Sequence, residues 1–100
     1  MLYLTQLVYL HPGQEAAFEA FEAEVIPLMS KYGGELVGRM KPGVGTWVDG
    51  IMAAPDEVHV VRFPDEAAFQ AFSADPRRQE LLPLKEQAIR EVVLIRGGRA

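Results

Sequence analysis

The chain has 100 residues, of which 49% are hydrophobic and 24% charged, and its net charge is −4. This length and balance are typical of one globular domain, so we expect a single domain over residues 1–100 rather than a disordered tail, a coiled coil or two cores. The absence of cysteine excludes a disulfide scaffold, a thiolate metal site and a cysteine nucleophile. Two histidines and a negative charge favour neither a metal centre nor a nucleic-acid partner.

The first predicted element is a strand over Leu2–Leu10. This run is apolar, but it lacks the basic start and the cleavage site of a secretion signal. His11-Pro12-Gly13 ends it far short of the roughly 20 residues that cross a membrane. We therefore expect a cytoplasmic protein with no membrane partner.

A helix is predicted over Gln14–Tyr32, where apolar residues recur every three or four positions. Pro27 should kink its last turns, and Gly33-Gly34 should end it. The glutamates of this helix could form a carboxylate metal site, but the ligands of such sites converge from several elements. We therefore expect them to form a solvent-exposed acidic face: Glu15, Glu19, Glu22 and Glu24.

The remaining elements follow in an order that defines the fold. Strands are predicted over Glu35–Met40, Glu57–Phe63 and Glu91–Arg96, and residues 41–56 form a long loop rich in glycine. Short helices are predicted to begin after Asp65, at Pro76 and at Pro83. The order β-α-β-β-α-β is that of a ferredoxin-like α+β fold, an antiparallel sheet with helices on one face.

The predicted strands are apolar on both faces, although one helical layer can cover only one of them. In Leu2–Leu10, for example, leucines and valines alternate with Tyr3, Leu7 and Tyr9. We therefore expect a homodimer in which two sheets close on each other. The alternative is that the loop 41–56 folds over the open face of a single chain.

Fragments of the sequence, in this order, resemble one known family, the domain of unknown function 1330: Lys31–Leu36, Phe63–Phe72, Asp75-Pro76-Arg77, Leu81–Glu86 and Val92–Leu94. The resemblance covers most of the chain outside residues 41–54, and it implies a dimeric α+β barrel. That group includes cofactor-free monooxygenases, haem-degrading enzymes, lactone isomerases and polyketide cyclases. Their catalytic residues share no motif that maps onto this chain, and a fold alone does not assign a function.

His59 is the strongest candidate for chemistry. It lies in the middle of the strand Glu57–Phe63, where a neutral histidine could act as a general base near pH 7. If the first and third strands pair, Tyr3 and Tyr9 would lie beside it. We therefore predict His59 and Tyr9 as catalytic residues, with Tyr3 as a ligand contact. A hydrogen-bonded core histidine is the structural alternative.

Three further residues are predicted to contact a ligand. Arg62 projects from the strand face opposite to His59, where an ion pair is favoured over an anionic ligand. Gln6 is the one amide in an apolar strand, so its side chain needs a partner. Trp47 in the glycine-rich loop could cover a pocket or pack at the rim of a dimer.

Two classes of function remain open. The first is a small-molecule enzyme without a cofactor, of monooxygenase or isomerase type, that works by proton transfer. The second is a non-catalytic dimer module that binds a small ligand or has only a structural role. A pocket of a few hundred cubic ångströms beside His59 would favour the enzyme. Side chains that fill this space would favour the module.

Overall fold

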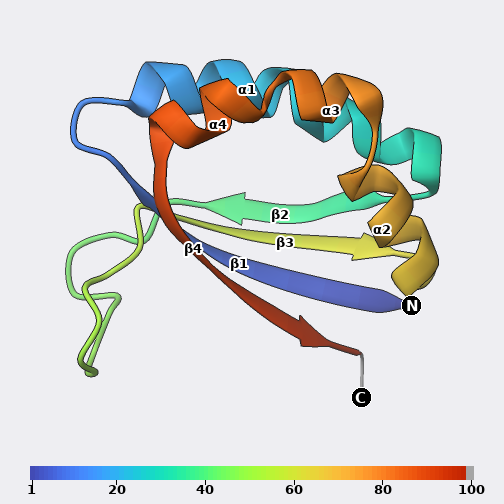
Figure 1. Cartoon of the computed structure of the whole chain (residues 1–100). Coiled ribbons are helices and arrows are strands. Elements are labelled where there is room, and N and C mark those ends of the chain that lie inside the picture. The colour runs from blue at the N-terminus through green and yellow to red at the C-terminus, as the bar shows by residue number, and fades with distance from the viewer. Residues whose placement is uncertain (99–100) are drawn as a thin grey trace.

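A computed structural model describes residues 1–98 as a four-stranded sheet with helices on one of its faces (Figure 1). The strands are β1 (Leu2–Leu10), β2 (Glu35–Met40), β3 (Glu57–Phe63) and β4 (Ile89–Gly97), and their order in the sheet is β2-β3-β1-β4. All three strand pairs are antiparallel. The ferredoxin-like α+β fold predicted from the sequence is therefore confirmed.

The helical layer consists of five short segments: α1 (Glu15–Leu28), the 3₁₀ turn η1 (Met29–Tyr32), α2 (Glu66–Ser73), α3 (Pro76–Glu80) and α4 (Leu82–Ala88). The helix predicted over Gln14–Tyr32 is thus an α-helix that changes to a 3₁₀ turn just after Pro27. Gly33 ends the turn at a φ of 74°, a left-handed conformation that favours glycine. None of the helices in residues 1–98 is long and apolar enough to cross a membrane.

The core lies between α1 and the face of the sheet that the helices cover. Phe63 of β3 is completely buried there, together with Leu4 of β1 and Phe18 of α1. The chain passes so close to Phe63 at Gly34 that an added Cβ atom would lie 2.4 Å from its Cε1 atom. Glycine is therefore required at this position by the packing of the neighbouring strand.

The register of β1 against β3 decides which side chains share a face. Gln6 lies opposite His59, and Tyr3 lies opposite Arg62. Along the whole pairing, even-numbered residues of β1 face odd-numbered residues of β3. Since side chains alternate along a strand, Gln6 and His59 both point towards the helices, whereas Tyr3 and Arg62 point to the opposite face.

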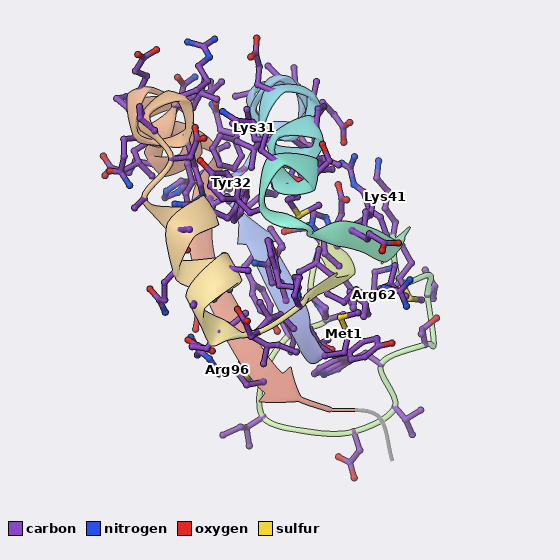
Figure 2. The ribbon with its side chains drawn as sticks, turned by 90° about the vertical axis from the view of Figure 1, so that its right-hand side faces the viewer. Met1, Lys31, Tyr32, Lys41, Arg62 and Arg96 are labelled. Carbon is purple, nitrogen blue, oxygen red and sulfur yellow. The ribbon has the colours of Figure 1, made fainter. Side chains whose placement is uncertain are left out.

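The sheet face turned away from the helices is called the open face below, and its apolar residues are Leu7, Val58, Val60, Val93 and Ile95. The first four of these side chains are partly exposed, and Ile95 is 51% exposed. The loop of residues 41–56, called the arm below, projects from one end of the sheet away from the helices (Figure 1). In the side view of Figure 2, the sheet lies between the helical layer above and the arm below.

The arm touches the sheet mainly at its last residues. The Tyr9 hydroxyl donates a hydrogen bond to the Ala53 carbonyl at 2.9 Å, and the Asp56 amide donates to the Val8 carbonyl at 2.8 Å. Three apolar residues earlier in the arm are almost fully exposed: Val44, Val48 and Ile51. The arm therefore covers Tyr9 but leaves most of the open face uncovered.

Candidate functional site

A cavity of about 80 Å³ lies between the helical layer and the sheet. Its wall is mainly apolar, with five polar or charged side chains among the lining residues: Gln6, Glu22, His59, Arg78 and Lys85. One water needs roughly 10–15 Å³ of such space, so the cavity matches a molecule of roughly five to eight non-hydrogen atoms. It is smaller than the few hundred cubic ångströms expected of an enzyme pocket, but side chains do not fill it.

His59 is only 2% exposed and lies between two carboxyl groups. Its Nε2 atom is 3.1 Å from Oε1 of Glu57, and its Nδ1 atom is 3.8 Å from Oε2 of Glu22. The ring also packs against Phe18, with 5.8 Å between the ring centroids. Burial lowers the pKa of His59, although Glu57 acts to raise it. The imidazole is therefore neutral at pH 7.

Glu57 holds the imidazole in one orientation. Burial acts to raise the pKa of Glu57, but hydrogen bonds from Arg39 and His59 outweigh it and lower that pKa, so the group is a carboxylate. Arg39 donates to it from Nε at 2.6 Å and also contacts Glu19. Because Glu57 only accepts, the Nε2 atom of His59 carries the proton, and its Nδ1 atom presents a lone pair towards Glu22.

Glu22 is the residue that sequence reasoning missed. It was expected on a solvent-exposed acidic face with Glu15, Glu19 and Glu24, but it is only 8% exposed, whereas the other three are exposed as predicted. It follows Phe18 by four residues and precedes Val25 by three, which places it on the apolar stripe of α1. This spacing is the signal that could have identified it.

The carboxyl group of Glu22 is suited to exchange protons at neutral pH. Burial raises its pKa to about 7, helped by the nearby charges of Glu57 and Glu19 and opposed by Arg39. A group with this pKa is present in both protonation states near pH 7, which is the property of an efficient general acid or base. Together with the neutral His59, it places a proton donor and a proton acceptor on the cavity wall.

The predicted cluster of Tyr3, Tyr9 and His59 is wrong. The register places both tyrosines on the open face, while His59 points to the helices. The sequence could identify the two faces of each strand but not which face of β1 matches which face of β3, because a shift by one residue exchanges them. Of the residues predicted for the site, His59 and Gln6 meet in the cavity.

Arg62 and Trp47 also lie outside the cavity. Arg62 forms the ion pair favoured for it, with Glu35 at 3.1 Å, and it donates to the Tyr3 hydroxyl at 3.3 Å. Trp47 belongs to the arm, where its indole Nε1 donates to the Met52 carbonyl at 2.8 Å. Within residues 1–98, no three His, Asp or Glu side chains are arranged to hold a metal ion.

Several solved structures share the fold. The RPA0582 protein of unknown function from Rhodopseudomonas palustris is 22% identical, with a TM-score of 0.86 over 99% of this chain and 82% of that chain. A NIPSNAP domain protein from Burkholderia xenovorans is 15% identical, with a TM-score of 0.72 over 100% and 95% of the two chains. A dabb family protein with a ferredoxin-like fold from Mesorhizobium loti is 12% identical, with a TM-score of 0.66 over 99% and 96%. At these identities the similarity shows the fold alone.

Comparisons of the sequence, in contrast to those of the structure, give a match to one family. No curated protein matches this chain. The model of one family, described as "Domain of unknown function (DUF1330)", matches residues 6–98.

Proposed function

Because this chain belongs to the DUF1330 family, whose description assigns no activity, we propose a function from the geometry of the cavity: proton transfer on a small molecule, without a cofactor. The observation that carries the proposal is the pair of Glu22 and His59, which lies 3.8 Å apart on the cavity wall and is almost fully buried. Paired titratable groups in a mainly apolar cavity are typical of acid–base catalysis.

The reaction that fits the pair is the movement of a proton next to a carbonyl group. The Glu22 carboxylate takes the proton from a carbon beside the carbonyl. The electrons of the broken C–H bond form a C=C bond, and the carbonyl electron pair moves onto oxygen as an enolate. Return of a proton from Glu22 to the same carbon gives exchange. In a substrate with a C=C bond beside that carbon, its return to the far carbon of the conjugated system completes an isomerisation, and neither outcome needs an oxidant.

Gln6 and His59 have supporting roles in this proposal. The side-chain amide of Gln6 lines the cavity opposite His59 and forms no hydrogen bond with the protein within residues 1–98. It is therefore free to donate to the enolate oxygen, a contact that strengthens as charge develops. The Nδ1 lone pair of His59 faces the Glu22 carboxyl group while it holds the substrate proton, and the carboxylate is regenerated when that proton returns to carbon.

We also propose that the working form is a homodimer joined through the open face. The support is the row of apolar, partly exposed side chains at Leu7, Val58, Val60 and Val93. A sheet face of this kind is normally covered. The exposed apolar residues of the arm lie on the same side of the sheet, so a second copy would cover both.

Solvent exchange tests the proposed activity. Small ketones and oxo acids are incubated with the protein in D₂O, and proton NMR measures the loss of each C–H signal. Wild type and Glu15→Gln, an exposed carboxylate on the same helix, should speed up exchange equally. Glu22→Gln should slow it by about 100-fold or more.

Equal activity of Glu22→Gln and wild type would contradict the proposal. Binding of a compound by the wild type without any exchange would instead support the alternative, a non-catalytic module that binds a small ligand.

A further inference from the structure

Two cations on the cavity wall have no salt-bridge partner in the described part of the chain, although the charge of Glu22 acts on both of them. Arg78 of α3 and Lys85 of α4 both line the cavity, and within residues 1–98 neither forms a salt bridge. The neighbouring Arg77 is different, because it pairs with both Glu24 and Glu80. Exposed arginines of this chain are thus commonly paired, whereas the two cations at the cavity are not.

The Arg78 guanidinium is held in place on one side only. It lies over the Phe72 ring, 5.4 Å from its centroid, and donates from NH1 to the Ser73 carbonyl at 3.2 Å. Its Nε atom is buried and has no hydrogen-bond partner among residues 1–98. A buried N–H without a partner destabilises the protein unless a bound molecule accepts its hydrogen bond.

The charge of Arg78 also acts on Lys85. Burial lowers the pKa of Lys85, and the positive charge of Arg78 lowers it further. Burial lowers the pKa of Arg78 as well. Glu22 is the one carboxyl group in the described wall, and with a pKa of about 7 it is only partly ionised. The part of the wall formed by Arg78 and Lys85, both partly exposed, is therefore positive, and a bound anion would be stabilised there.

We infer that the cavity binds a small carboxylic acid, with its carboxylate held by Arg78 and Lys85 and its carbon chain directed towards Glu22 and His59. This inference rests on the proposed proton-transfer function, for which it names the substrate class: a short oxo acid with an exchangeable C–H bond. A guanidinium group fits a carboxylate with two parallel hydrogen bonds. The volume of about 80 Å³ limits the acid to roughly five to eight non-hydrogen atoms.

Acetoacetate and acetoacetamide provide a matched pair of probes, because they have the same size and differ in charge. Isothermal titration calorimetry at pH 7 should show acetoacetate binding to the wild type about tenfold or more tightly than the amide. Arg78→Gln and Lys85→Gln should each weaken acetoacetate binding by about tenfold or more, and should leave the amide unchanged. Arg78→Lys, which keeps the charge, should recover part of the loss.

Arg77→Gln is the control, since it removes an adjacent arginine that is paired with glutamates. It should bind acetoacetate like the wild type, and circular dichroism checks that every variant is folded. The inference is overturned if the wild type does not bind acetoacetate, if the amide binds equally well, or if Arg77→Gln loses as much affinity as Arg78→Gln. Tighter binding of inorganic phosphate than of acetoacetate would also overturn it.

The two proposals fail in different ways. If acetoacetate binds through Arg78 but its C–H protons do not exchange in D₂O, the substrate site is supported and the proton-transfer function is wrong. If the wild type exchanges the protons of acetoacetamide as fast as those of acetoacetate, and Arg78→Gln does not change either rate, the function is supported and the carboxylate site is wrong.

Discussion

Oε2 of Glu22 lies 3.8 Å from Nδ1 of His59, and the two side chains come from α1 and β3, on opposite walls of the cavity. The other imidazole nitrogen is 3.1 Å from Glu57, which is itself bound to Arg39. A continuous chain of charged and polar groups therefore runs from the edge strand β2 to the cavity. Glu22 is the end of this chain that can change its charge near pH 7.

The Glu22→Gln variant should be more stable than the wild type at high pH. Glu22 has an ordinary pKa of 4.5 and a pKa of about 7 in the folded protein, so the folded state binds its proton more tightly than the unfolded state. The stabilisation that Glu22 provides by binding its proton more tightly in the folded state is fully present below about pH 4.5, and it is lost as the pH rises to 7. One pKa unit corresponds to about 1.4 kcal/mol, so the shift from 4.5 to about 7 limits the advantage of the neutral glutamine to about 3.5 kcal/mol well above pH 7.

Urea unfolding at pH 4.5, 7 and 9 measures this difference. Glu15→Gln, an exposed position on the same helix, serves as the control and should show no such dependence on pH. A Glu22→Gln variant that is less stable than the wild type by the same amount at every pH would show that folding does not raise the Glu22 pKa.

As the pH falls, His59 should become protonated at a lower pH than an ordinary histidine does. Burial lowers its pKa below 6.5, and Glu57 opposes that effect. Replacement of Glu57 with glutamine should therefore lower the His59 pKa further. The Cε1–H chemical shift in proton NMR follows the titration, and His11→Gln assigns the two histidine signals. A His59 titration at or above pH 6.5 would contradict the buried placement.

Lysine in place of Val60 should separate the proposed dimer. Val60 lies in the middle of the open face, opposite Thr5 of β1 and Gly38 of β2. A buried ammonium group at a subunit interface is strongly unfavourable. The wild type should sediment at twice the protomer mass and Val60→Lys at the protomer mass. Ala71→Lys, exposed on α2, is the control that should keep the dimer, and a monomeric wild type would refute the assembly.

Gly34 and Gly38 should respond differently to alanine, although both lie at or near β2. An alanine Cβ at Gly34 would lie 2.4 Å from Cε1 of the completely buried Phe63. The resulting overpacking should cost about 1–3 kcal/mol in the free energy of unfolding. At Gly38 nothing lies within 4 Å of the added atom, so the change should stay within about 0.5 kcal/mol. Equal thermal unfolding of the two variants would contradict the close packing at Gly34.

Asp75 should contribute stability that disappears in acid. Its carboxylate accepts hydrogen bonds from the Tyr32 hydroxyl and from the backbone amides of Arg77 and Arg78, and it pairs with Lys31. Figure 2 shows Lys31 and Tyr32 in the helical layer. The Tyr32 hydrogen bond is the main cause that lowers the Asp75 pKa from 3.8 to about 2.

Because this pKa is lowered in the folded state, the stabilisation is present above about pH 4 and is lost between pH 4 and pH 2. Thermal unfolding at a series of pH values should show that loss in the wild type. Asp75→Asn should not show it, and Tyr32→Phe should show a smaller one. An identical acid profile in all three proteins would refute the role of this carboxylate.

The fold could be predicted because local signals agree with one another. The strand bounds of β1, β2 and β3 match those expected from the sequence, and β4 begins two residues earlier than expected, at Ile89. Proline and glycine residues mark most of the positions at which the predicted helices and strands begin or end. At Asp65, for example, the side chain accepts from the Ala68 amide at the start of α2, as expected of a residue at that position.

The candidate site could be predicted only in part, because it depends on long-range geometry. His59 was identified as a polar residue in an apolar strand, but its neighbours depend on the register of β1 against β3, which no local pattern determines. Glu22 was expected at the surface because it is charged, although its place on the apolar stripe of α1 indicates burial. Lys85 carries no sequence signal of its own, since it becomes part of the cavity only when α4 packs over the sheet.

The pairing of β1 with β3 also determines where this protein can change in length during evolution. One residue inserted into β3 before His59 would turn the imidazole to the open face and place a valine towards the cavity. The first part of the arm has no such constraint, since Ala53 and Asp56 make its hydrogen bonds to the sheet. Residues 43–52 can therefore gain or lose length while the cavity keeps its composition, and such a change would alter the surface that the arm offers to the proposed second copy.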